Sequence, residues 1–267
     1  NNYIHDTTDS PIRFGLGFGG GVDSADWDIT GNWIENINGD AKTAMVLFNI
    51  DGLNIDNNFV DHSDTTFDGR RGLNLDGSSN VSVTDNIVRM GADVNSLDET
   101  ATGTEAAWAI QIGMSDQEVA NITIDGNELS GARFGVVGLS QRSLDGLTVT
   151  NNTITEVYNG VSLNSGGTAP VVTNVVNSNI VLEGNTIEAI TNAYRLRDLH
   201  DNTTNGPVVF ETVTIDGNTV VSGIVRVGGV DGALGGDDFA NIAGVNTFTG
   251  TAGDDIVMVE GTGTITV

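Results

Sequence analysis

The chain has 267 residues, of which 36 are acidic and 10 are basic, so its formal net charge is −26. A surplus of this sign repels polyanions, which argues against binding to nucleic acid or to an anionic membrane surface. The chain has no cysteine, which excludes disulfides and thiolate metal sites. No apolar run approaches the ~20 residues that span a bilayer.

Taken in chain order, the predicted strands begin with copies of one short motif. It reads apolar, any, apolar, polar, small or polar, Asn, any, apolar. Clear copies occupy 27–34, 53–60, 81–88, 122–129, 147–154, 180–187 and 213–220. Weaker copies are NNYI at the start of the chain and NIAGVNTF at 241–248. The motif asparagines are Asn2, Asn32, Asn58, Asn86, Asn127, Asn152, Asn185, Asn218 and Asn246.

Each copy starts with alternating apolar residues, which is the pattern of a strand, and then breaks at Gly, Asn or Asp, which tolerate turn conformations. A second alternation follows most copies, as in RGLNL at 71–75, WAIQI at 108–112 and NGVSL at 159–163. No stretch reads as a helix of useful length. Each repeat is therefore predicted to be a strand, a tight turn at Asn, a second strand, and a variable loop or short third strand.

A unit of about thirty residues cannot bury its apolar face alone, whereas stacked units can, with each strand paired to the same strand one repeat away. In such a stack the motif asparagines lie above one another, and their amides hydrogen-bond along the stack as an asparagine ladder. We expect Ile124, Val149, Leu182 and Ile215 to form one interior column beside that ladder.

With this repeat the sequence resembles a right-handed parallel β-helix of the pectin-lyase-like kind, especially the group with repeats of the form NxI…GIxL. The resemblance implies an all-β, single-domain β-solenoid over 1–267, with about nine coils, one for each motif asparagine. It leaves function open, because this family includes polysaccharide lyases, glycoside hydrolases, uronan epimerases, phage tailspikes and surface adhesins.

Both ends of the sequence fall inside a repeat. The chain opens at the Asn of a motif, NNYI, and closes with TITV, which resembles the strand that precedes a motif Asn. We therefore expect a segment of a longer solenoid, or a subunit whose coils stack head to tail on those of a neighbour, since an uncovered edge strand invites pairing.

The resemblance also directs attention to arginine and to calcium, because the lyases of this family pair a Lys or Arg base with Ca²⁺ held by carboxylates. If Tyr194 and Leu196 point inward, Arg195 points outward on a ledge. The residues of this ledge are Arg195, Arg197, Asp198, His200 and Asp201. Such a cluster can bind a uronate carboxylate and shuttle protons, or it can be an exposed network of ion pairs.

Acidic loops are the candidates for calcium, a hard ion that takes six to eight oxygen ligands. Three segments offer them: DSADWD, DHSDTTFD, and GTAGDDIVM, which loosely resembles one nonapeptide of the calcium-binding repeats-in-toxin type. The candidate ligands are Asp23, Asp26, Asp28, Asp61, Asp64, Asp68, Asp254 and Asp255. The alternative for each loop is a solvated surface.

We therefore expect a structural or adhesive module of an exported surface or fibre protein, located outside the cell or on its surface. The first alternative is a lyase or epimerase that acts on acidic polysaccharide with calcium. The second is a tailspike-like carbohydrate-binding module.

Overall fold

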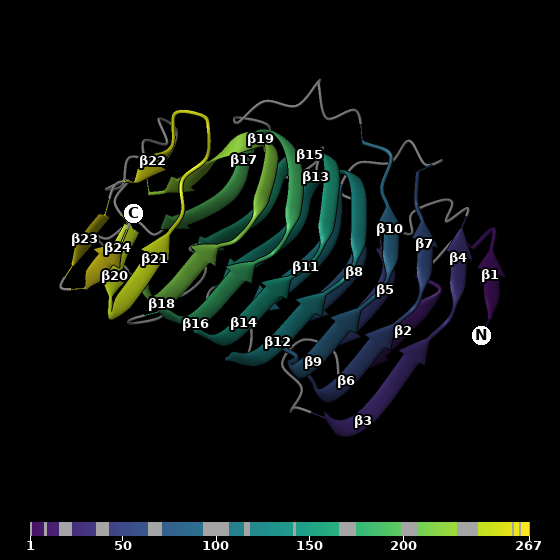
Figure 1. Cartoon of the computed structure of the whole chain (residues 1–267). Helices are drawn as coiled ribbons and strands as arrows, with labels where there is room; N and C mark the ends of the chain where they lie inside the picture. The colour runs from purple at the N-terminus through teal and green to yellow at the C-terminus, as the bar shows by residue number, and fades with distance from the viewer. Residues whose placement is uncertain are drawn as a thin grey trace.

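The computed structural model of the chain describes residues 2–7, 10–15, 23–35, 43–63, 71–92, 107–114, 118–140, 143–165, 175–198, 208–228, 240–257, 259–261 and 263–266. Within these ranges there are strands and turns but no helix. Every strand pair among them is parallel, and strands that pair come from successive repeats (Figure 1). The fold is therefore all-β and consistent with a parallel β-solenoid. We call the stretch from one motif asparagine to the next a coil.

One sheet contains the strands that precede the motif asparagines. It has eleven strands. They are β3 (Asp23–Thr30), β6 (Ile50–Asp56), β9 (Ser79–Thr84), β12 (Val119–Asp125), β14 (Leu144–Thr150), β16 (Val175–Glu183), β18 (Val208–Asp216), β20 (Ala240–Ala243), β21 (Val245–Phe248), β23 (Val259–Gly261) and β24 (Thr264–Thr266).

The other sheet has thirteen strands and curls around the stack. Its short strands directly after the asparagine are β1 (Tyr3–His5), β4 (Trp33–Glu35), β7 (Phe59–Asp61) and β10 (Ile87–Arg89). Its second strands are β2 (Ile12–Gly15), β5 (Thr43–Phe48), β8 (Arg71–Asp76) and β11 (Trp108–Met114). In later coils one strand spans both regions, in β13 (Glu128–Ser140), β15 (Thr153–Ser165), β17 (Thr186–Asp198) and β19 (Thr219–Val227), and the sheet ends with β22 (Ile256–Val257).

The turn between the two sheets depends on the residue before each asparagine. This residue has a positive φ, which only Gly, Asn and Asp adopt at low cost. The turn residues, with φ between 53° and 69°, are Gly31, Asn57, Asp85, Gly126, Asn151, Gly184 and Gly217. The prediction that the repeats break at such a residue is confirmed for the seven clear copies of the motif.

Hydrogen bonds join the motif asparagines from coil to coil. In the described residues each side-chain Nδ2 donates to the Oδ1 of the next asparagine at 2.8–3.2 Å. The series runs through Asn2, Asn32, Asn58, Asn86, Asn127, Asn152, Asn185 and Asn218. We call this series the asparagine ladder.

The buried side-chain amides of Asn58, Asn86, Asn127, Asn152 and Asn185 also donate to backbone carbonyl oxygens, so their burial leaves no side-chain polar atom unsatisfied. Asn127 Nδ2 also donates to the carbonyl oxygens of Val83 at 2.9 Å and Asp125 at 3.1 Å. The Oδ1 of Asn152 accepts a second hydrogen bond, from the backbone N–H of Asn127 at 2.9 Å. The ladder therefore replaces, inside the stack, the water that the turn would otherwise need.

Apolar columns fill the interior beside the ladder. The expected column is confirmed, because Ile124, Val149, Leu182 and Ile215 are consecutive partners in register and are at most 1% exposed. The column extends in both directions to Ile29, Ile55, Val83 and Phe248. A thin core of this kind needs aliphatic residues rather than many large rings, which fits the aromatic content of 6%.

Small residues line the bend at which the chain enters the second strand. At Gly160 an added Cβ would lie 2.4 Å from the carbonyl oxygen of Ala193 and 2.8 Å from Cγ2 of Ile187. The equivalent glycine one coil earlier, Gly135, would meet Cγ2 of Ile154 at 2.5 Å. Gly or Ala therefore recurs here because two coils approach too closely for a larger side chain.

The expectation that Asn246 belongs to the ladder is wrong. Thr247 pairs with Thr214 and Phe248 with Ile215, so Asn246 lies one coil away from Val213, in an apolar column. There its Oδ1 accepts the backbone N–H of Val213 at 2.8 Å. The same step of 33 residues places Thr251 opposite Asn218, where the ladder asparagine would be.

Candidate functional site

The expected arginine ledge lies only partly within the described residues. Tyr194 and Leu196 are fully buried in the core, as the expected alternation requires. Arg195, which lies between them, is also buried, with 6% of its surface exposed, so the expectation that it stands on an exposed ledge is wrong. The side chains of Arg197 and Asp198, and all of His200 and Asp201, lie outside the described residues.

Register places Arg195 in a row of outward positions along the thirteen-stranded sheet. Its partners are Ser162 in β15 and Arg226 in β19. The same register continues from Ser162 back through the earlier coils, and the first residue of the row is Arg13 in β2. Arg195 and Arg226 are thus neighbours in register on adjacent strands of a strongly acidic chain.

The calcium candidates do not meet at one point in the part of the chain that the structure describes. No group of three or more His, Asp or Glu side chains there could hold a metal ion. Asp26 and Asp28 are exposed, and Asp28 Oδ1 accepts the side-chain N–H of Asn54 at 3.2 Å. Asp64, Asp68 and the side chain of Asp23 lie outside the described residues.

Of the remaining acidic candidates, Asp61 and Asp255 accept hydrogen bonds from backbone N–H groups of nearby turns or strands. Asp61 Oδ1 accepts the backbone N–H of Ser63 at 3.0 Å. Asp255 Oδ2 accepts the backbone N–H of Thr251 at 2.6 Å, and its Oδ1 accepts that of Val225, thirty residues earlier, at 2.8 Å. Asp255 therefore closes its own loop against β19. Asp254, its neighbour, is exposed.

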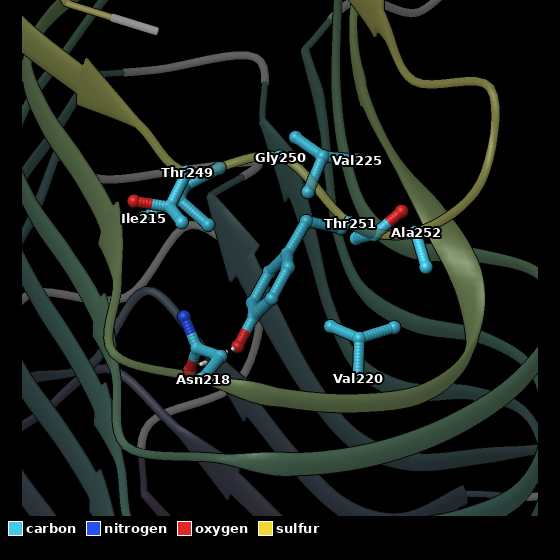
Figure 2. A pocket seen from close by; sticks show the side chains of 9 residues that line it. Ile215, Asn218, Val220, Val225, Thr249, Gly250, Thr251 and Ala252 are labelled. Atoms are coloured by element: carbon cyan, nitrogen blue, oxygen red, sulfur yellow. Dashed lines mark hydrogen bonds between the residues drawn. The ribbon is translucent and has the colours of Figure 1, made fainter.

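A cavity of about 200 Å³ lies beside the last asparagine of the ladder (Figure 2). Its lining includes Asn218 and Val220, and also Gly250, Thr251 and Ala252 from the next coil. These small residues leave space that the larger residues of the preceding coils fill.

The titratable group among the described lining residues of this cavity is a neutral phenol, which lies with the polar residues Asn218, Thr249 and Thr251. Tyr194 donates its O–H to Oδ1 of Asn218 at 2.6 Å, and Asn185 Nδ2 donates to the phenol oxygen at 3.2 Å. Burial raises the pKa of Tyr194 well above its ordinary value, so the phenol stays protonated at neutral pH. The described lining residues include no carboxylate, imidazole or amine. The cavity therefore offers hydrogen bonds and apolar contact, but no general acid or base.

Aromatic side chains form a row on the outside of the first coils, in the short strands after the asparagine. Tyr3, Trp33 and Phe59 are consecutive register partners in β1, β4 and β7. Tyr3 is 60% exposed, Trp33 is 47% exposed and Phe59 is half-buried. Ring centroids lie 6.4 Å apart between Tyr3 and Trp33, and 4.3 Å apart between Trp33 and Phe59. We call these three residues the aromatic strip.

A row of titratable side chains runs parallel to the aromatic strip, two residues further along the same strands. They are His5, Glu35, Asp61 and Arg89, again in consecutive register. Glu35 holds two rings, since one carboxylate oxygen accepts the O–H of Tyr3 and the other accepts the indole N–H of Trp33 at 2.7 Å. These two hydrogen bonds keep the pKa of Glu35 below its usual range, so the carboxylate is charged at neutral pH.

Sequence reasoning missed the aromatic strip, although the signal was available. All three aromatic residues directly follow a ladder asparagine, in Asn2–Tyr3, Asn32–Trp33 and Asn58–Phe59. The motif leaves that position unrestricted, so aligning it across repeats would have shown aromatic residues in the first copies and threonine in the later ones.

The described part of the chain contains no helix of the length and apolarity that crossing a bilayer requires. Comparisons with protein-family models, with curated proteins and with solved structures find no significant match to this chain.

Proposed function

We propose that the chain is a structural and adhesive module of an exported surface or fibre protein. In this proposal 1–267 is one domain, a right-handed parallel β-helix of the pectin-lyase-like kind with about nine coils, one for each predicted repeat. It works outside the cell or on its surface, and its coils stack on further coils of the same polypeptide or, head to tail, on a neighbouring copy.

The continuous asparagine ladder is the observation that carries this proposal. It joins Asn2 to Asn218 through an unbroken series of side-chain hydrogen bonds, and its asparagines from Asn32 to Asn185 are buried. A fully satisfied polar network stiffens the structure that contains it. Parallel strands also repeat outward side chains every ~4.8 Å, so a stiff stack presents them as straight rows. Rows on a stiff rod suit attachment to an extended partner.

An enzyme and an attachment module should give different results in the same experiment with polysaccharides. The purified chain is incubated with insoluble and soluble polysaccharides, both neutral and acidic. Retention on a polysaccharide and the absorbance of unsaturated products in the ultraviolet are measured together. We expect retention without product. Release of product from any uronan would contradict the non-enzymatic proposal, and an absence of retention on every material would contradict the adhesive one.

A lyase or epimerase is the second candidate, and the register of Arg195 with Arg226 favours it. Paired guanidinium groups can bind the carboxylates of a uronan bidentately. Calcium, held by carboxylates that include Asp23, Asp64 or Asp68, belongs to this candidate. If it is right, Arg195→Ala abolishes product release.

A further inference from the structure

The aromatic strip is not required by the fold, because later coils place non-aromatic residues at the same position, and the last three of these are threonine. In register after Phe59 come Ile87, Glu128, Thr153, Thr186 and Thr219. Glu128, Thr153 and Thr219 are exposed, and their coils retain the ladder and the core columns. The stability of a coil therefore does not explain why the first coils have exposed aromatic residues at this position.

The strip is also held in place before any partner arrives. Glu35 binds Tyr3 and Trp33 through separate carboxylate oxygens. Phe59 packs on Trp33, and the guanidinium of Arg89 lies 5.2 Å from the Phe59 ring centroid. Because the rings are already fixed, they lose little side-chain entropy when a partner binds.

The residues around the rings indicate which partner fits. Aromatic rings contact apolar C–H surfaces, whereas the carboxylates of Glu35 and Asp61 accept hydrogen bonds and Arg89 donates them. A sugar ring has an apolar C–H face and a rim of hydroxyl groups that both donate and accept. A row of rings beside a parallel row of charged groups matches that chemistry better than it matches a uniformly apolar partner.

We infer that the aromatic strip, with the parallel row of Glu35, Asp61 and Arg89, binds a neutral polysaccharide that lies along the axis of the stack. This inference rests on the proposed adhesive role and names its partner. The two carboxylates and the net charge of −26 disfavour acidic polysaccharides and anionic lipid surfaces.

The experiment compares the whole chain with two variants. The strip variant is Trp33→Thr with Phe59→Thr, which introduces the residue that later coils use at this position. The matched control is Trp27→Thr, because Trp27 is 40% exposed and belongs to the same repeat but precedes the turn in β3. Affinity electrophoresis measures retardation by neutral polymers (hydroxyethyl cellulose, mannan and xylan), and by carboxymethyl cellulose, which has the same backbone as the first with added charge.

We expect retardation by at least one neutral polymer, and weaker retardation by carboxymethyl cellulose than by hydroxyethyl cellulose. The strip variant should lose about tenfold or more in affinity, as loss of aromatic anchors does, whereas Trp27→Thr binds as wild type. Circular dichroism and the urea midpoint confirm that both variants are folded.

Several outcomes overturn the inference. Equal binding by the strip variant and wild type shows that the strip is not the site, while retention itself still supports the adhesive role. Stronger binding to carboxymethyl cellulose than to hydroxyethyl cellulose overturns the inference of a neutral partner and assigns the contact to arginine side chains, such as those of Arg195 and Arg226. Retardation by none of the polymers overturns the inference, and an absence of retention on every polysaccharide overturns the adhesive proposal with it.

Discussion

Asn127 donates its side-chain amide to Oδ1 of Asn152 at 2.9 Å, and both side chains are at most 1% exposed. The same oxygen also accepts the backbone N–H of Asn127. One amide oxygen therefore satisfies two buried donors of the neighbouring coil, which neither Asp nor Ser can do while also donating two hydrogen bonds to carbonyl groups.

Replacement of Asn152 by alanine should destabilise the chain by about 1–3 kcal/mol, because it leaves buried donors of Asn127 and acceptors of its own coil without partners. Urea unfolding followed by circular dichroism measures the change. The control is Thr153→Ala, which alters the exposed neighbour and should stay within about 0.5 kcal/mol of wild type. Equal effects of the two substitutions would show that the ladder contributes nothing specific.

Gly160 should not tolerate alanine. The new Cβ would lie 2.4 Å from the carbonyl oxygen of Ala193, which is backbone and cannot rotate away, so we expect a loss of about 1–3 kcal/mol from overpacking. Gly217→Asn is the control. Its φ is 61°, no atom lies within 4 Å of an added Cβ, and Asn151 occupies the equivalent turn position with a φ of 54°. A tolerated Gly160→Ala would mean that the coils can separate.

Filling the cavity of Figure 2 should stabilise the chain. Val220 lines it, and the same column contains Ile154 and Ile187 in the two preceding coils. Val220→Ile adds one methylene group, which contributes about 0.8 kcal/mol when buried. Val60→Ile adds the same group at a fully buried position of that column, where overpacking should destabilise. Thermal unfolding of both variants measures the difference, and a rise for both or for neither would argue against the cavity.

Stability should fall at alkaline pH because of Tyr194. Burial raises the pKa of its phenol above the value in the unfolded chain, so the unfolded state releases the proton first as the pH rises. The contribution of Tyr194 is therefore complete below the unfolded pKa, about 10, and is lost as the pH rises above it. Tyr194→Phe removes the phenol group, and with it this contribution to the pH dependence of stability.

The variant should accordingly have a shallower loss of stability between about pH 9 and pH 11 than wild type. At neutral pH it should be less stable by about 1 kcal/mol, since the hydrogen bond to Asn218 is lost. Urea unfolding across this pH range measures both effects. Parallel curves for the two proteins would place the alkaline loss on other groups.

The sequence by itself determined the local elements and their stacking. Strand alternation, a turn residue that accepts a positive φ, and an asparagine after it are properties of a few adjacent residues, and their recurrence implies parallel pairing between coils. That is why the column of Ile124, Val149, Leu182 and Ile215, and the ladder from Asn2 to Asn218, could be predicted.

Only the tertiary structure decided what depends on the register between distant segments. Asn246 lies in a copy of the motif that is too weak to align. The pairing of Phe248 with Ile215 places Asn246 in an apolar column of the core and not in the ladder. Arg195 follows the expected alternation, but alternation gives the direction of a side chain and not what covers it. The aromatic strip exists because register brings Tyr3, Trp33 and Phe59 together across coils. Residues some thirty positions apart become neighbours through backbone pairing, so the sequence shows the strip only when the repeats are aligned, and the exposure and contacts of its rings come from the tertiary structure.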